Sequence, residues 1–180
     1  MKKVSKLIPI IGLFFAVNYF IGCGKEIRPA LSSGMNDTLT SEIQYAGGVP
    51  EVQGFDFTEG RIRFEYAGQA GSVLDLAMEV QVNGTNFPIG GTFILPDNRP
   101  FIIDMGNAGL NDITEAPADG YVISLINISS NRSYCILTSE GKYAKIYVND
   151  VVMDQREDGT PFIYIRFEWK FQPNGSRYFD

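Results

Sequence analysis

The sequence predicts an all-β fold, an antiparallel sandwich or a curled sheet of hairpins with a loop-rich middle section. Apolar and polar residues alternate with a period of two over long stretches beyond residue 42, as they do in strands that bury one face. Glycine, proline and asparagine interrupt these runs at short intervals, and no apolar pattern of helical period is long. Short strands joined by such turns are typical of all-β domains.

Residues 1–22 have the layout of a signal peptide. A basic segment with three lysines precedes a nearly unbroken, uncharged apolar stretch over residues 7–21. A membrane-spanning helix needs about 20 apolar residues, whereas this stretch is shorter and contains Pro9 and Asn18. We therefore expect the segment to be removed.

Residues 20–23, Phe-Ile-Gly-Cys, resemble the lipobox of bacterial lipoproteins, in which a small residue precedes an acylated cysteine. The resemblance implies that Cys23 becomes the new N-terminus and that its acyl chains, such as palmitate, anchor the exported protein to the outer membrane or cell surface. Phe20 departs from the usual leucine. The alternative is an uncleaved signal anchor that happens to contain a cysteine.

Residues 23–42 are predicted to form the acylated cysteine and a flexible tether, because they are polar and have neither helical nor strand period. A tether of about 20 such residues would span roughly 25 Å on average. A single all-β domain is then expected over residues 43–180, which is long enough to bury a sizeable core.

The first predicted strands have one apolar face each. Ile62 begins a run in which apolar and charged residues alternate, and the run over residues 74–82 places Met78 among the core-facing positions. Asn83 and Gly84 follow, and both tolerate positive φ, so they predict a hairpin turn.

Residues 86–120 form the loop-rich section, because closely spaced prolines and glycines end regular structure every few residues. We expect short strands near residues 91–95 and 101–104 and a helical turn near Leu110.

The last sixty residues predict a meander of hairpins, with strands at 121–128, 134–138, 143–152 and 162–171. In the last strand the odd-numbered residues are expected to face one way and the even-numbered residues the other. Aromatic residues also occur on faces that are otherwise polar, so a loop of the chain, a ligand or a partner should cover part of the second face. These residues are Tyr143, Tyr147, Phe162 and Tyr164.

Composition limits the function. Without residues 1–22 the chain keeps 12 basic and 21 acidic residues, a net charge of about −9, and this surface would repel nucleic acid. No histidine is present, which removes the commonest general base and the histidine metal sites. We therefore expect no enzyme, and the remaining catalytic alternative is a hydrolase with paired carboxylates. Cys135, the cysteine left after acylation, is expected to be a buried, inert thiol.

Residues 140–145, Glu-Gly-Lys-Tyr-Ala-Lys, and 171–176, Phe-Gln-Pro-Asn-Gly-Ser, resemble the HmuY-like haem-binding lipoproteins of Bacteroidota. Residues 54–60 also look like that family's first strand and turn. The resemblance implies an all-β domain that holds haem near one end. Well-known members hold iron with two histidines and some relatives use methionine, so the histidine ligands cannot carry over to this chain.

Five residues are candidates for ligand contact. Met105 and Met153 lie at the ends of segments, where a thioether can meet a ligand, although packing or simple exposure is the alternative for both. Lys142, Tyr143 and Lys145 would grip an acidic group such as a haem propionate, although alternating charge on an outer strand face is ordinary.

The predicted function is therefore an envelope-anchored ligand-binding module that binds haem without histidine. The alternative is a structural or adhesive surface lipoprotein that binds a protein or a glycan.

Overall fold

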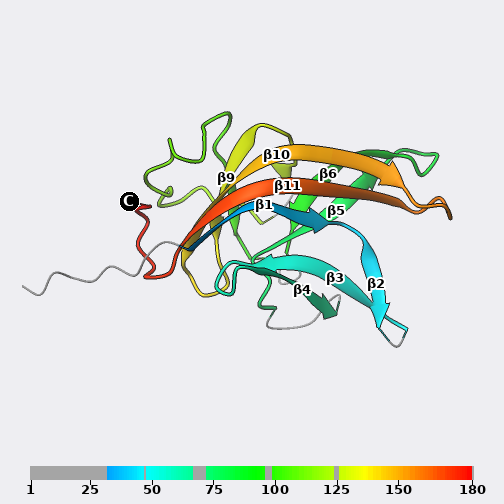
Figure 1. Ribbon diagram of the computed structural model, residues 1–180, viewed down its shortest axis with the longest axis horizontal. Coiled ribbons are helices and arrows are strands. Elements are labelled where there is room, and N and C mark those ends of the chain that lie inside the picture. The colour runs from blue at the N-terminus through cyan, green and yellow to red at the C-terminus, as the bar shows by residue number, and fades with distance from the viewer. Residues whose placement is uncertain (1–31, 47, 67–71, 96–98, 124–125, 180) are drawn as a thin grey trace, which may run out of the picture.

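The computed structural model describes residues 32–46, 48–66, 72–95, 99–123 and 126–179. Its strands form two antiparallel sheets that stack as a sandwich (Figure 1), and the described residues include no helix. The prediction of an all-β sandwich is thus confirmed. Near Leu110, where a helical turn was expected, the chain forms a single hydrogen-bonded turn, in which the backbone N–H of Asp112 donates to the Gly109 carbonyl at 3.0 Å.

The first sheet contains, in spatial order, β1 (Ser32–Thr40), β11 (Pro161–Gln172), β10 (Tyr143–Gln155), β9 (Arg132–Leu137) and β7 (Ile102–Asp104). The second contains β2 (Ile43–Ala46), β3 (Val49–Asp56), β5 (Leu76–Val82), β6 (Pro88–Ile94) and β8 (Ile126–Asn127), with β4 (Arg61–Tyr66) paired to β3. Strands β9, β10 and β11 form the predicted meander.

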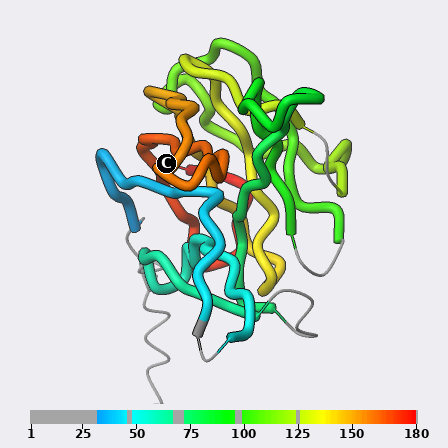
Figure 2. Tube along the Cα trace, turned by 90° about the vertical axis from the view of Figure 1, so that its right-hand side faces the viewer, coloured from blue at the N-terminus to red at the C-terminus, as the bar shows by residue number. Residues whose placement is uncertain are grey.

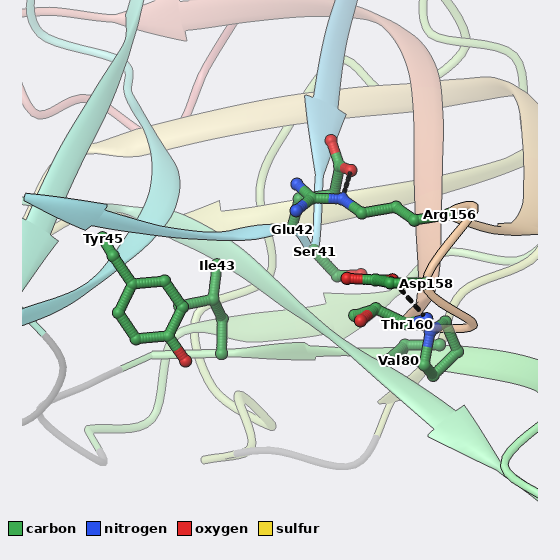
Figure 3. Close-up of a pocket in the computed structure, with 9 residues that line it drawn as sticks. Ser41, Glu42, Ile43, Tyr45, Val80, Arg156, Asp158 and Thr160 are labelled. Carbon is green, nitrogen blue, oxygen red and sulfur yellow. Dashed lines mark hydrogen bonds and ion pairs between the residues drawn. The ribbon is translucent and has the colours of Figure 1, made fainter. Parts of the chain in front are cut away.

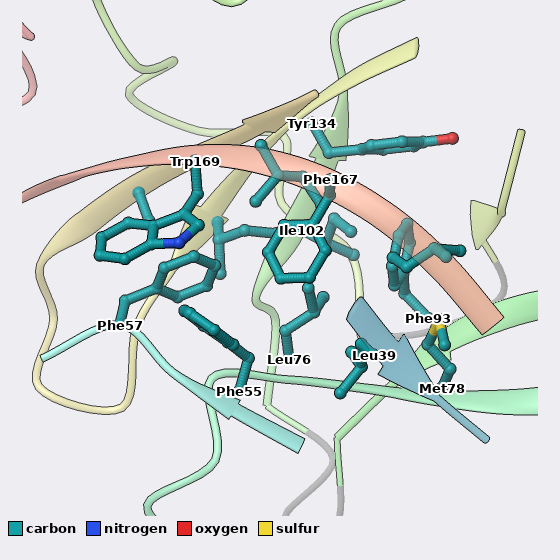
Figure 4. Packing of buried hydrophobic residues seen from close by; sticks show 14 of the residues in the cluster. Leu39, Phe55, Phe57, Leu76, Met78, Phe93, Ile102, Tyr134, Phe167 and Trp169 are labelled. Carbon is teal, nitrogen blue, oxygen red and sulfur yellow. The ribbon is translucent and has the colours of Figure 1, made fainter. Parts of the chain in front are cut away.

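The core lies between the two sheets and is rich in aromatic rings (Figure 4). Phe55 of β3 contacts Phe167 and Trp169 of β11 edge to face, with ring centroids 5.2 and 5.4 Å apart. Along β11 the odd-numbered residues from Ile163 to Phe171 are buried, as the alternation predicts. Met78 is also buried in this core, as predicted.

The prediction of a tether up to residue 42 is wrong from residue 32 onward, because residues 32–40 form β1. This strand pairs with β11 and places Leu39 fully inside the core. Its polar composition misled the prediction, since an edge strand needs few apolar side chains when its backbone bonds to a neighbour. The domain therefore begins before residue 43, and Cys23 lies outside the described residues.

Two further predictions need correction. In the predicted strand 121–128, residues 124–125 lie outside the described residues, and among the described residues of this range the strand covers Ile126–Asn127. The turn after β5 is longer than Asn83-Gly84, since the backbone N–H of Asn83 donates to the carbonyl of Phe87 and the positive φ falls at Asn86.

The alternation predicted for residues 74–82 also fails in part. Asp75 is only 1% exposed although it was expected on a polar face, whereas Val82 is 42% exposed at the end of β5. Asp75 is buried because it accepts hydrogen bonds from both sheets, as described below.

Candidate functional site

The sandwich has two ends that differ in character. At the end called proximal, β1 begins beside the end of β11, with Ser32 opposite Phe171. At the other end, called distal, lie the β10–β11 turn over residues 156–160 and the β5–β6 turn. These turns are linked, because the Gln155 side-chain amide donates to the carbonyl of Asn86 at 2.9 Å. Figure 2 is turned so that the distal end faces the viewer.

A pocket of about 240 Å³ opens at the distal end, between β2 and the β10–β11 turn (Figure 3). Its lining residues come from three separate segments of the chain. They are Ser41, Glu42, Ile43, Tyr45, Val80, Arg156, Asp158, Thr160 and Pro161.

One side of this distal pocket is apolar and the other is polar. Tyr45 and Ile43 are 70% and 47% exposed and lie apart from Arg156 and Asp158 in Figure 3. Two side chains on so open a surface offer apolar area that a ligand can cover.

Internal contacts hold the polar side in place. The Arg156 guanidinium pairs with the Glu42 carboxylate at 2.6 Å, which raises the pKa of Arg156. The Asp158 carboxylate accepts the backbone N–H of Thr160 at 2.8 Å, and this hydrogen bond holds the pKa of Asp158 below its usual range. The pocket therefore presents two carboxylates and one guanidinium.

This arrangement is suited to binding rather than to glycoside hydrolysis. A hydrolytic pair needs one carboxylic acid with a raised pKa, whereas the pKa of Asp158 is lowered and Glu42 is engaged by Arg156.

Exposed apolar side chains surround the distal end. Met153 of β10 is opposite Ile163 in the sheet, and Ile163 is fully buried, so Met153 lies on the core-facing side of its strand. It is nevertheless 46% exposed. Val82, Phe87 and Ile89 at the ends of β5 and β6 are also exposed, and together with Met153 they are called the distal apolar surface.

The structure separates the two candidate methionines. Met105 is half-buried and packs against a second, small cluster that includes Cys135 and Phe179. Its backbone N–H donates to Ser133 at the start of β9. Met153 lies about six residues further along the sheet, roughly 20 Å at the usual rise per residue. They do not share a site.

Lys145 is inside the protein and not on an outer face. It is 1% exposed, its ammonium donates to the Ile113 carbonyl at 2.5 Å, and it lies 4.6 Å from the centroid of the Phe179 ring. Its charge is therefore not available to a ligand at the surface.

Lys142 and Tyr143 belong to the proximal end. The Lys142 ammonium pairs with Glu140 at 2.5 Å, and Tyr143 packs against the small cluster with its ring 6.4 Å from that of Tyr121. The chain's own loops thus cover this part of the second face. Phe162 and Tyr164, further along β11, are half-buried and stack on each other.

Cys135 is buried and free, as predicted. Burial raises the pKa of its thiol to about 12, although the neighbouring Lys145 charge acts in the opposite direction. Since the thiolate is the reactive form, this thiol is suited to packing.

The segments that carry the family resemblance meet at the proximal end. Asp56 and Glu59 from one segment and Glu140 from another line a cavity of about 350 Å³, and Lys142 lies 5.8 Å from the centroid of the Phe171 ring. The acidic groups are engaged internally, since Asp56 pairs with Arg63 at 2.9 Å and Glu140 with Lys142. The carboxylates of Asp56 and Glu140 in this cavity are therefore already paired with basic side chains of the chain.

Within the described ranges, no three histidine, cysteine, aspartate or glutamate residues are grouped so as to hold a metal ion. The same part of the chain has no helix of the length and apolarity required to span a membrane.

Comparison with known proteins does not identify a family. No protein-family model matches the chain, and no curated protein matches it. The resemblance to the HmuY-like proteins stays a prediction from the motifs.

Sequence reasoning missed the distal pocket because its residues share no motif. Glu42 and Arg156 are 114 positions apart, and Glu42 lies in the segment that was predicted to be a tether. The only local signal was the acidic turn at residues 154–158, which by itself is typical of a solvated hairpin.

Proposed function

We propose that this protein is an envelope-anchored lipoprotein that binds haem at the distal end of its sandwich, with the Met153 thioether as an iron ligand. The observation that supports the proposal is the exposure of this thioether on the core-facing side of β10, within the distal apolar surface. The faces of a porphyrin are apolar and planar, so Val82, Phe87 and Ile89 offer area for them to cover.

The proposal keeps Met153 and drops the other four residues that the sequence predicted as ligand contacts. Met105 contributes to packing of the small cluster, and Lys142, Tyr143 and Lys145 lie away from the distal turns. A thioether is a soft ligand that favours reduced iron. Binding through Met153 should therefore be tighter for reduced haem than for oxidised haem.

A titration tests the proposal. Haemin is added to the protein without residues 1–22, first under oxidising and then under reducing conditions, and the Soret band is recorded. We expect the larger spectral change in the reduced sample. Met153→Leu should remove most of that change, because leucine keeps the apolar volume but lacks the sulfur.

Two variants serve as matched controls. Met35 is an exposed thioether on β1 and Met105 a half-buried one, so Met35→Leu and Met105→Leu should leave the spectrum unchanged. If neither redox state changes the spectrum, or if Met153→Leu behaves as wild type, haem binding through this residue is contradicted.

The alternative, a surface lipoprotein that binds a protein or a glycan, is favoured by a different feature. The distal pocket is smaller than the roughly 300–1,000 Å³ of sites for drug-sized ligands, and its walls combine an exposed aromatic ring with fixed charges. Co-purification of a partner with the anchored protein, lost when Tyr45 is changed to alanine, would support this alternative.

A further inference from the structure

We infer that the distal pocket binds a single neutral sugar ring, the terminal or side-branch unit of a glycan. The inference is independent of haem binding, because it rests on the residues of the pocket and not on the distal apolar surface. The pocket volume of about 240 Å³ suits one ring-sized unit.

The apolar side of the pocket fits one face of a pyranose. A sugar ring presents axial C–H groups on one face, and these pack against an aromatic ring. The Tyr45 side chain is 70% exposed and Ile43 is 47% exposed beside it, while Val80 completes the lining from β5. An exposed tyrosine combines apolar area with a hydroxyl that can form hydrogen bonds.

The polar side of the pocket matches the hydroxyl groups of a sugar. Each hydroxyl can both donate and accept, and the pocket holds acceptors in Asp158 and Glu42 and a donor in Arg156. The Arg156–Glu42 pair and the Thr160 N–H bond to Asp158 hold these groups in position before a ligand arrives. Hydrogen bonds to ionised groups are stronger than those between neutral groups.

The charges favour a neutral sugar over an anionic one. The two carboxylates leave the pocket with one excess negative charge, since Arg156 offsets only one of them. An anionic sugar would also meet the acidic turn that contains Asp154 and Glu157. A neutral ring satisfies donors and acceptors without that repulsion.

The test uses methyl glycosides as probes. Methyl glycosides of glucose, galactose, mannose, N-acetylglucosamine and fucose are titrated to tens of millimolar against isotope-labelled protein lacking residues 1–22, and backbone amide shifts are followed by NMR. At least one glycoside should shift the amides of residues 41–45 and 156–160 together, with millimolar affinity. Tyr45→Ala and Asp158→Ala should each weaken it about tenfold, a loss of about 1.4 kcal/mol.

Tyr178→Ala is the matched control, because Tyr178 is another exposed tyrosine but lies near the proximal end, where its carbonyl accepts a hydrogen bond from Gln172. It should bind the glycoside as wild type does. The inference is overturned if the full panel leaves these amides unshifted or if Tyr45→Ala binds unchanged. Haemin titration of Tyr45→Ala separates the two proposals, since its spectrum should match wild type.

Discussion

Asp75 is the buried carboxylate that ties the two sheets together at the proximal end. Its Oδ2 accepts the backbone N–H of Phe57 at 3.0 Å, and its Oδ1 accepts the backbone N–H of Ser139 at 2.7 Å and the Ser139 hydroxyl at 3.0 Å. The Arg99 guanidinium lies 3.7 Å away. One side chain thus connects the end of β3 to the β9–β10 turn.

We expect Asp75→Ala to lower the free energy of unfolding by about 3 kcal/mol, because it leaves buried donors of Phe57 and Ser139 without an acceptor. Asp75→Asn should cost less, since its amide oxygen still accepts from one side. Urea denaturation of the three proteins measures the difference. Equal stability of the alanine variant and wild type would contradict this role.

Asp75 also gives stability a defined pH dependence. Burial raises the pKa of Asp75 above its ordinary value of 3.8, against the opposing hydrogen bonds and Arg99. The folded state therefore holds this proton more tightly than the unfolded chain, and the associated stability is lost as pH rises through the folded-state pKa. As pH falls towards about 4, wild type should gain stability relative to Asp75→Asn. A relative loss would mean that the hydrogen bonds outweigh burial.

Among the strands, β1 is an edge strand that is held in the sheet by antiparallel pairing with β11. It bulges between Gly34 and Asp37, where the Trp169 indole N–H donates to the Asp37 carboxylate at 2.6 Å. Gly34 lies against the same indole, and a Cβ there would fall 2.3 Å from its nitrogen. Only glycine therefore lets this strand approach the ring.

Gly34→Ala should destabilise the protein by about 1–3 kcal/mol, because the indole or the strand must shift to admit the methyl group. Trp169 is the only tryptophan of the chain, so its fluorescence should change together with the urea midpoint. Gly84→Ala is the matched control, since no atom lies within 4 Å of a Cβ there, and it should stay within about 0.5 kcal/mol of wild type. Equal effects of the two substitutions would contradict the close approach.

Across the whole molecule, Ser32, the first described residue, and both proposed sites lie at opposite ends. If Cys23 carries the lipid, the nine residue steps from Cys23 to Ser32 span at most about 30 Å. This maximum distance is about half of that for the 20-residue tether expected from composition. We propose that the proximal end then lies nearer the membrane than the distal pocket and the distal apolar surface do.

Cys23→Ala should abolish incorporation of labelled palmitate and release the domain from the membrane fraction, because the predicted anchor is covalent. Cys135→Ala is the matched control and should remain acylated, since Cys135 is buried in the sheet. Metabolic labelling followed by membrane fractionation measures both. Continued acylation of Cys23→Ala would contradict the lipobox prediction.

The candidate site could be predicted from the sequence only in part. Met153 was predicted as a ligand contact from its place near a turn, and its side chain is exposed, so a ligand can reach it. The prediction that Lys145 lies on an outer strand face is wrong. Alternation predicts which face a side chain is on, but it does not predict that a loop such as the one at Ile113 covers that face. The distal pocket depends on Ser41, whose backbone N–H donates to Ile163, a contact between positions far apart in the chain.

The fold class and most strands of the C-terminal meander could be predicted from the sequence, because period-two alternation and turn residues are local properties of the chain. Three features could not be predicted in this way: polar residues 32–40 form a strand, Asp75 is buried, and Glu42 pairs with Arg156. Each of these depends on a partner distant in sequence: the β11 edge for β1, the Ser139 turn for Asp75, and the β10–β11 turn for Glu42. A polar residue can be stable in a strand or in the interior when a distant part of the chain satisfies its hydrogen bonds. The residues next to it in the sequence do not reveal that partner.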